Sequence, residues 1–498
     1  MKNIKLILIL LLVVAGVSCS KNFLDVKPLA NPSTDVLFKS EAGINMLLNA
    51  TYAELRSFNL SGFGWFVAKE VGSDDANPGS NAGDHSVARM RDFQNFSYLP
   101  TETDLNSFWS GNYNLIAKAN LVIQYAPNVK FTDTADRARY IGEAKFLRAL
   151  AYFNLVRGWG GVPLITKVVS DPTSAAKVIP RSSVAEVYAF LEKELNEAIG
   201  VLPLKSGYPA NELGRATKGA AQTLLAQVYL FQQKNSDCLK ECMNVINSGE
   251  YSLYPKYWMV SNVNNQNGAE SIFEVQFQYN LDIANSWQQW QGVRGTGSGW
   301  GFFSPSLSLA NSYEAGDPRR DYSIYFKGEP WPYSGETNIH WAAGTDPRAN
   351  EKTMLPRPFP PGFAGHSPLN RVVMRYADVL LMAAECDNEL GNTSDALKYL
   401  EMVRARAREG KPVLPEITET NMIKLRHIIW NERRHELADE GYRAYDIRRY
   451  DKVEPGFAKK LYDALGRTNY SAKDALYPIP QIEMDFDTKG VLQQNPGW

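Results

Sequence analysis

The chain has 498 residues, with 54 acidic and 53 basic side chains and a net charge of −1. A chain so close to neutral gives no electrostatic reason to expect nucleic acid or an anionic membrane surface as a partner. Its length allows a large core, in one domain or in two closely joined ones. Aromatic residues are abundant at 12%, including 11 Trp and 25 Tyr, whereas the five His are scattered.

The first nineteen residues have the pattern of a secretory signal. Two lysines precede an apolar run, Leu6 to Val14, which is followed by small residues and Cys19. The run is shorter than the roughly 20 apolar residues of a transmembrane helix. Gly16-Val17-Ser18 before the Cys resembles a bacterial lipoprotein processing site, although Leu is usual where Gly16 stands. We expect a signal peptide over residues 1–18 and lipidation of Cys19; an ordinary signal peptide is the alternative.

The remaining cysteines predict packing and neither a disulfide framework nor a metal site. Without Cys19 an odd number is left: Cys238, Cys242 and Cys386. Cys238 and Cys242 lie four apart on one predicted helix, which aims them poorly for a bridge. No His lies near them in the sequence, so we expect no metal and place all three in the core.

Helical periodicity recurs along the mature chain. Predicted helices cover residues 41–56, 105–125, 136–156, 183–199, 217–232 and 421–441. The clearest stretch is 371–391, where apolar side chains recur with the spacing of one broad helical face. Gly391 stands where a left-handed C-terminal cap is wanted, and Thr393 or Ser394 can cap a following helix over 395–408. These two helices predict an antiparallel hairpin.

This hairpin has a counterpart earlier in the chain. A shift of 158 positions lays KNSDCLKECMNV, residues 234–245, over NTSDALKYLEMV, residues 392–403, and places the helix from Thr217 over the helix from Arg375. Repeated helical hairpins that stack to share one core are typical of the tetratricopeptide architecture. The predicted fold is therefore mainly α, a tetratricopeptide-like scaffold of helical hairpins whose repeat spacing is interrupted by long insertions.

Composition changes between the helical regions. From 255 to 310 only five residues are charged, Asn and Gln are frequent, and six of the eleven Trp lie between Trp258 and Trp341. Pro and Gly interrupt this region throughout, so we expect irregular structure. The prediction is one domain over 19–498, with a helical scaffold over about 35–254 and 371–498 and a loop-rich, ligand-binding insertion over about 255–370.

The chemistry of the insertion suits a sugar. Aromatic rings offer flat faces to the C–H surfaces of a sugar, and amides supply directional hydrogen bonds to its hydroxyls. Trp287, Trp290, Arg294 and Trp300 surround a glycine run in this insertion. The alternative for each single Trp is that its ring packs the insertion onto the scaffold.

Several patterns that suggest catalysis fail on inspection. The glycines from Gly295 to Gly301 are spaced G-x-G-x-G-x-G, without the strand and helix of a dinucleotide site. His435-Glu436 begins like a zinc-protease helix, but Asp439 stands where the second His must be. No G-x-S-x-G nucleophile turn occurs. We therefore predict a protein that is not an enzyme and that uses no cofactor and no metal.

Several blocks of the sequence, in order, match one known family. They are CSKNFLDVKP (19–28), GSDDA (72–76), GEAKFLRALAYFNLVRGWGGVPL (142–164), DPRR (317–320), RYADVLLMAAECDNELG (375–391), NERRHELADEGYRAYDIRRY (431–450) and LYPIPQIEMDFDTKGVLQQNPGW (476–498). On these blocks the chain resembles the SusD/RagB-like outer-membrane nutrient-binding lipoproteins of the Bacteroidetes.

The resemblance implies a lipid anchor in the outer membrane, facing the exterior, and a SusC-like TonB-dependent β-barrel transporter as partner. Family members deliver oligosaccharides to that barrel without chemistry of their own. Their aromatic platforms come from loops that correspond roughly to residues 72–96 and 280–333. With the composition of the insertion, this gives the candidate ligand-binding residues Trp65, Asp74, Asn77, Trp287, Trp290, Arg294 and Trp300.

The leading functional prediction is a cell-surface lipoprotein that binds glycans. A peptide-binding member of the same family is the alternative, which the scarcity of charge in the insertion disfavours. A secreted glycosidase and a pure scaffold for the barrel partner are further readings. Product release from an oligosaccharide would support the glycosidase, and co-purification with the barrel without any ligand would support the scaffold.

Overall fold

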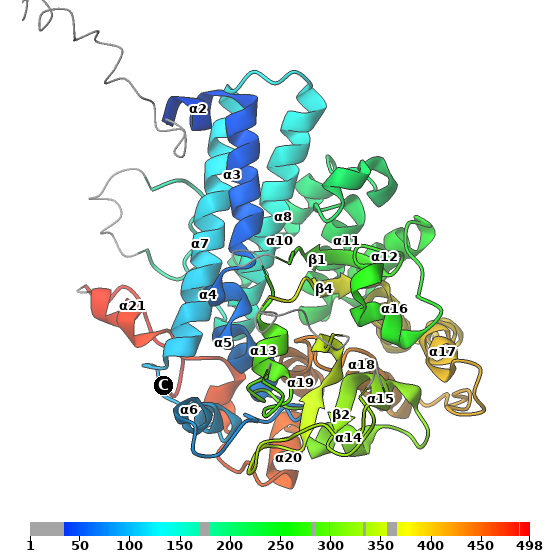
Figure 1. Ribbon diagram of the computed structural model, residues 1–498. Coiled ribbons are helices and arrows are strands. Elements are labelled where there is room, and N and C mark those ends of the chain that lie inside the picture. Colours follow the sequence, from blue (N-terminus) through cyan, green and yellow to red (C-terminus); the bar gives the residue numbers. More distant parts are fainter. Residues whose placement is uncertain are drawn as a thin grey trace, which may run out of the picture.

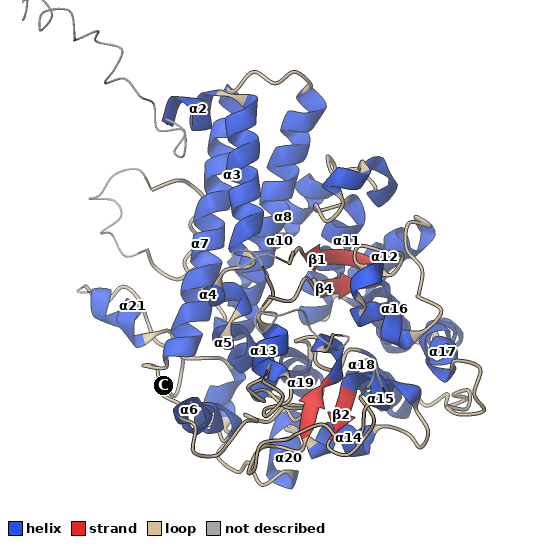
Figure 2. Ribbon diagram, in the orientation of Figure 1, coloured by secondary structure: helices blue, strands red, loops and turns tan. Residues whose placement is uncertain are grey.

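The computed structural model describes residues 34–169, 179–279, 284–297, 299–331, 335–355, 366–487 and 489–498. Helices form most of the ordered structure, and the few strands are short (Figure 2). The predicted signal peptide and Cys19 lie outside the described residues. No helix among the residues described is long and apolar enough to cross a membrane.

The α-helices are α2 (Thr34–Lys39), α3 (Glu41–Glu54), α4 (Phe58–Ser61), α5 (Phe63–Phe66), α6 (His85–Gln94), α7 (Thr103–Tyr125), α8 (Thr134–Trp159), α10 (Val184–Ile199), α11 (Lys218–Phe231), α12 (Asn235–Asn247), α13 (Trp287–Gln291), α14 (Leu307–Ser312), α15 (Pro318–Ser323), α16 (Tyr376–Glu389), α17 (Thr393–Arg408), α18 (Met422–Glu436), α19 (Arg443–Val453), α20 (Phe457–Ala464) and α21 (Gln481–Phe486). The strands are β1 (Ser271–Val275), β2 (Ile324–Phe326), β3 (Arg348–Asn350) and β4 (Arg371–Arg375).

The scaffold is a succession of packed helices. The long helices α3, α7, α8 and α10 stand side by side, and the chain then continues through α11, α12, α16 and α17, each packed on the one before it (Figure 1). Local chemistry fixes the helix starts. Ser183 and Glu186, for example, form a reciprocal capping box at the start of α10, and Asp133 caps α8.

The predicted pair of related hairpins is confirmed. Helices α11 and α12 form one hairpin, α16 and α17 form the other, and α12 packs against α16 to join them. Gly391 has the left-handed φ of +83° that the turn after α16 requires. Cys238, Cys242 and Cys386 are all free and buried at this junction, as predicted.

The first five residues of the predicted helix 371–391 are instead a strand. β4 pairs antiparallel with β1, with Ser271 opposite Arg375 and Val275 opposite Arg371. The helical spacing of apolar residues begins only at Tyr376, and the apolar Val372, Val373 and Met374 fit a strand as well as a helix, so only the distant partner strand decides. The last predicted helix, 421–441, likewise ends at Glu436, followed by turns.

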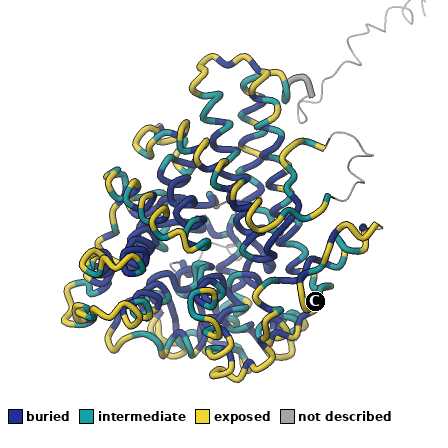
Figure 3. The backbone as a smooth tube through the Cα atoms, turned by 180° about the vertical axis from the view of Figure 1, so that it is seen from behind, coloured by how far each residue is buried: buried dark blue, intermediate teal, exposed yellow. Residues whose placement is uncertain are grey.

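The insertion is irregular, as predicted. Between β1 and β4 it contains short helices, the two-stranded sheet of β2 and β3, and long connecting segments. One part of it has a small core of its own, built on Val293, Tyr325, Trp331, Trp341 and Met354, whereas Trp287, Trp290, Phe302 and Phe303 belong to the large scaffold core. Buried residues run along the inward faces of the helices, while exposed residues collect at turns and loop ends (Figure 3).

A buried network of ion pairs joins the insertion to the scaffold. The carboxylate of Glu436, on α18, contacts the guanidinium groups of Arg375 at 2.5 Å, of Arg319 at 3.1 Å and of Arg406. Arg375 also pairs with Glu270 at 2.8 Å, directly before β1. Burial alone would raise the pKa of Glu436, but the three arginines outweigh it and hold the pKa well below its usual range.

Replacing Glu436 by Ala should lower the free energy of unfolding by about 3–5 kcal/mol, because it leaves three buried arginines short of a counter-charge. Chemical denaturation of the mature protein measures this change. Asp463→Ala is the matched control: it removes an ion pair with Lys459 whose side chains are 41% and 47% exposed, and it should cost less than about 1 kcal/mol. Equal losses in both variants would contradict a structural role for the network.

Candidate functional site

Three segments that are distant in the sequence interlock on the insertion side of the molecule. Isolated backbone bridges join Ala76 to Pro305, Gly79 to Phe302 and Asn81 to Thr345. We call the surface formed by residues 76–86, 292–297, 299–305 and 340–346 the loop platform. A Cβ atom at Gly79 would lie 2.3 Å from the carbonyl oxygen of Gly301, so this close approach of two backbones requires glycine.

Side chains reinforce the loop platform. The guanidinium of Arg294 donates to the hydroxyl of Ser80 at 2.6 Å and forms an ion pair with Asp84. The Ser80 hydroxyl in turn bonds Asp84 at 2.6 Å and the carbonyl oxygen of Trp300 at 2.7 Å. The hydrogen bond from Ser80, together with Arg294, lowers the pKa of Asp84. Asp84 therefore stays ionised, and the pair presents little net charge.

Trp300 is the exposed aromatic side chain of the loop platform. Its side chain is 43% exposed, while its backbone is fixed by a hydrogen bond from its N–H to the carbonyl of Gln289 at 2.7 Å. Its ring meets the buried ring of Phe302 edge-on, with centroids 6.3 Å apart. Exposure of the ring, fixation of the backbone and neighbouring polar groups are what a sugar-stacking position needs.

The other candidate tryptophans lie beneath this surface. Trp65, Trp287 and Trp290 are 3%, 6% and 8% exposed. Trp65 and Trp287 are in contact, with ring centroids 4.5 Å apart, and the indole N–H of Trp287 donates to the carbonyl of Ser61 at 2.7 Å. Together with Phe63, Phe66, Phe302 and Phe303 these rings form an aromatic layer between scaffold and insertion. In this structure they support the loop platform from within.

Asp74 and Asn77 occupy different environments. Asp74 is fully buried and pairs with Arg443 at 2.7 Å and Arg434 at 3.0 Å. Burial raises the pKa of Asp74, but the two arginines outweigh it and hold the pKa well below its usual range. Asn77 is half-buried and bonds Asp346 and Gln94. Both residues tie the loop platform to the scaffold, and their contact with ligand remains a prediction.

One exposed ring was missed by the sequence argument. Phe58, on α4, is 58% exposed and packs edge-on against Trp290 at 5.9 Å. Through Phe63 and Phe302 it connects with Trp300, so the aromatic layer reaches solvent at two places. Composition points to the insertion and its tryptophans, and no local pattern marks a Phe of the first helices as exposed.

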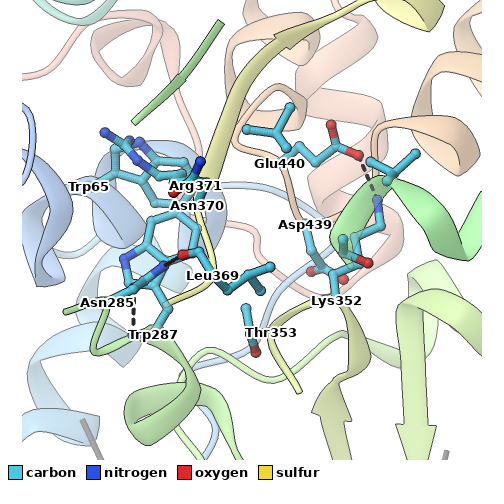
Figure 4. A pocket seen from close by; sticks show the side chains of 13 residues that line it. Trp65, Asn285, Trp287, Lys352, Thr353, Leu369, Asn370, Arg371, Asp439 and Glu440 are labelled. Atoms are coloured by element: carbon cyan, nitrogen blue, oxygen red, sulfur yellow. Dashed lines mark hydrogen bonds and ion pairs between the residues drawn. The ribbon is translucent and has the colours of Figure 1, made fainter. Parts of the chain in front are cut away.

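A small cavity of about 50 Å³ lies deeper, beside the aromatic layer. Trp65, Trp287 and Arg371 line one side, and Lys352, Asp439 and Glu440 line the other (Figure 4). Glu440 forms ion pairs with Lys352 and Arg375. Among the residues described, no group of three or more His, Cys, Asp or Glu side chains is arranged to hold a metal ion.

Asp439 is the carboxyl group of this cavity without a cationic partner at contact distance among the described residues. Burial, together with repulsion from Asp75 and Glu440, raises its pKa from 3.8 to about 8, although Lys352 opposes the shift. One oxygen of Asp439 has no hydrogen-bond partner among the described residues. At neutral pH the group is therefore largely protonated and contributes little negative charge to the cavity.

Two family models match the chain, and similar proteins cover it almost completely. The model described as "SusD family" matches residues 364–498, and the one described as "Starch-binding associating with outer membrane" matches residues 22–230. SusD-like protein P2 of Formosa agariphila is 28% identical over 527 aligned residues, covering 100% of both chains. A SusD-like protein of Bacteroides ovatus is 28% identical and covers 89% of this chain and 82% of its own.

Solved structures share the fold. A laminarin-binding SusD-like protein is 29% identical, with a TM-score of 0.79, and the match covers 93% of this chain and 100% of that one. Surface glycan-binding protein A from Bacteroides thetaiotaomicron, in complex with laminarihexaose, is 23% identical with a TM-score of 0.75. This match covers 92% of this chain and 100% of that one, and at this identity it shows the fold alone.

Replacing Asp439 by Asn should stabilise the protein increasingly as the pH rises. The folded Asp439 keeps its proton up to about pH 8, whereas the unfolded one loses it near 3.8. The wild type therefore loses stability between these values, by at most about 1.4 kcal/mol per pH unit, and the Asn variant does not. Chemical denaturation at pH 5 and pH 9 compares the free energies of unfolding of the two proteins. Asn is a suitable replacement because it tolerates the left-handed backbone at this position, where φ is +59°. A constant difference would contradict the raised pKa.

The buried and exposed tryptophans should respond differently to truncation. Trp287→Ala should lower the free energy of unfolding by about 3–5 kcal/mol, because it opens a cavity in the aromatic layer and leaves the Ser61 carbonyl unpaired. Trp300→Ala should change it by less than about 1 kcal/mol. Urea denaturation of both variants tests this. A large loss for Trp300→Ala would show that its ring supports the fold.

Proposed function

This chain belongs to the SusD family, and from this premise we propose that it is an outer-membrane lipoprotein that binds an uncharged oligosaccharide and has no catalytic activity. The observation that carries the proposal is the exposed Trp300 ring on the loop platform, with polar neighbours and a hydrogen-bonded backbone. The similar laminarin-binding protein, 29% identical over nearly the whole chain, supports the ligand class.

The charge of the loop platform favours a neutral ligand. Arg294 is already paired with Asp84, so it offers no free cation to the carboxylate of a peptide terminus. Polar side chains that can meet sugar hydroxyls stand nearby: Asn81 bonds the carbonyl of Ala343, and His340 lies 3.0 Å from the carbonyl of Gly295. These groups of the loop platform retain hydrogen-bonding capacity.

The proposed function also includes a lipid anchor at Cys19 and a transporter partner in the outer membrane. Lipidation at Cys19 would tether the protein to the outer membrane with the loop platform free to meet ligand outside. A SusC-like TonB-dependent transporter would then accept the captured oligosaccharide. Outer-membrane association is supported by the description of the family model that matches residues 22–230.

Calorimetric titration of the mature protein with laminarin oligosaccharides tests the binding function. We expect saturable binding that Trp300→Ala weakens at least tenfold, which corresponds to about 1.4 kcal/mol. Trp258→Ala is the matched control, because that ring is 38% exposed but lies outside the loop platform. The oligosaccharide should be recovered at its original length.

Three results would count against the proposal. Undiminished binding by the Trp300 variant would move the site away from the loop platform. Shortened oligosaccharides would show a glycosidase. No binding to laminarin or to any other uncharged glycan on an array, by folded protein, would favour a peptide ligand.

A further inference from the structure

A second cavity lies away from the loop platform, between α3, the segment 211–215 and the end of β1. We call it the α3 cavity. Its volume is about 280 Å³. One water molecule needs roughly 10–15 Å³ on the same measure, so the α3 cavity can admit a small organic molecule.

Two walls of the α3 cavity are held against each other. The side-chain amide of Gln276 donates to the side chain of Asn267 at 3.0 Å and to the carbonyl of Glu274 at 2.9 Å. On the facing segment, Gly214 has a φ of +97°, and a Cβ atom there would lie 2.5 Å from the amide carbon of Gln276. The backbone of residues 211–215 therefore packs directly on a hydrogen-bonded side chain of the β1 wall.

Arg56 is the cation of this cavity that lacks a counter-charge. It follows α3, is half-buried and lines the cavity. Its one hydrogen bond among the described residues, to the carbonyl of Gln276, is at the limit of length at 3.5 Å. None of its nitrogens is both sealed from solvent and without a partner, so its unused N–H groups are open to a ligand. Burial lowers its pKa, and no carboxylate of the described residues opposes that shift.

The other arginine of the lining is already paired. Arg215 forms an ion pair with Glu143 at 3.1 Å and lies 3.8 Å from Glu212. Glu212 also pairs with Arg139 at 3.0 Å. Two acids and two arginines are balanced in this group, and none of their charge is left to compensate Arg56.

Glu274 is the remaining acid of the lining. It is buried, and its carboxylate accepts hydrogen bonds from the backbone N–H of Asn267 at 3.1 Å and from the amide of Asn370 at 2.9 Å. Burial raises its pKa, and these hydrogen bonds and the charge of Lys205, which also faces Glu250, oppose the shift. The partners of Glu274 are therefore these donors and Lys205, and the guanidinium of Arg56 remains unpaired.

We propose that the α3 cavity binds an acidic sugar unit, with its carboxylate on Arg56 and its hydroxyl groups on the amides of Asn49 and Asn211. Arginine forms strong charge-assisted bonds to carboxylates. Asn49 is exposed and accepts from Arg215 at 3.0 Å through its oxygen, which leaves its N–H groups available. Asn211 is exposed as well, and Leu213, 41% exposed, adds apolar surface to the polar lining.

The α3 cavity and the loop platform differ in the charge that they offer. The arginine of the loop platform, Arg294, is neutralised by Asp84, whereas Arg56 has no such partner among the described residues. No residue of the loop platform lines the α3 cavity. The inference therefore does not rest on the function proposed for the loop platform.

Calorimetric titration of the mature protein with sodium glucuronate and sodium galacturonate, at constant ionic strength, tests the site. We expect saturable binding of at least one of them, no saturable binding of glucose, and binding of acetate weaker by at least about tenfold. Failure of both sugar acids to bind would overturn the proposal. Glucose bound as tightly would overturn the role of Arg56, and acetate bound as tightly would overturn the assignment to a sugar.

Substitution of the arginine makes the test specific. Arg56→Met removes the charge and should raise the Kd at least about tenfold. Arg137→Met is the matched control, because Arg137 is a half-buried arginine of α8 that does not line the α3 cavity. Unchanged affinity in Arg56→Met, or an equal loss in the control, would overturn the proposal.

A charge added at the surface gives a test that does not depend on a buried position. Leu213→Glu places a carboxylate in the lining, so repulsion should weaken the binding of the sugar acid. Val201→Glu is the control, because Val201 is equally exposed, at 42%, and lies outside the lining. Equal effects of the two substitutions would place the ligand elsewhere and overturn the proposal.

Discussion

The buried carboxylate of Glu436 is the interaction on which the arrangement of scaffold and insertion depends. It receives Arg375 from the strand that closes the insertion, Arg406 from α17 and Arg319 from the insertion itself. Each of these arginines has at least one further carboxylate partner, so charge is balanced over the whole network. Ion pairs at this depth stabilise only when every member is paired, which makes the network a strict geometric constraint.

The aromatic layer attaches the loop platform to the scaffold, as the ion pairs of Glu436 attach the rest of the insertion. Rings from α4 and α5 pack against rings from α13 and the segment after it, and the stacked pair of Phe66 and Phe303 spans the two parts with centroids 4.2 Å apart. Ligand-facing loops usually have little support of their own. Here the ring of Trp300 contacts Phe302, which itself packs on Phe63 in the aromatic layer.

Much of the fold could be predicted from the sequence, because helical periodicity and capping residues are local signals. The hairpin of α16 and α17 and the cap at Gly391 follow from such signals, whereas β4 does not, since its partner lies a hundred residues away. For the site, composition gives candidate segments but not the exposure of single rings. The sequence does not distinguish Trp287 from Trp300. Trp287 is buried because α5 packs against α13, whereas Trp300 is exposed.

The pairing of β1 with β4 has an evolutionary consequence. Because Val275, the last residue of β1, lies opposite Arg371, the first residue of β4, the segment between the two strands leaves and rejoins the scaffold at one point. Loops that are closed in this way accept added length cheaply, at about 0.6 kcal/mol for each doubling. Mutation can therefore lengthen or exchange parts of this segment, while the ion pairs of Glu270 and Arg319 keep its attachment to the scaffold in place.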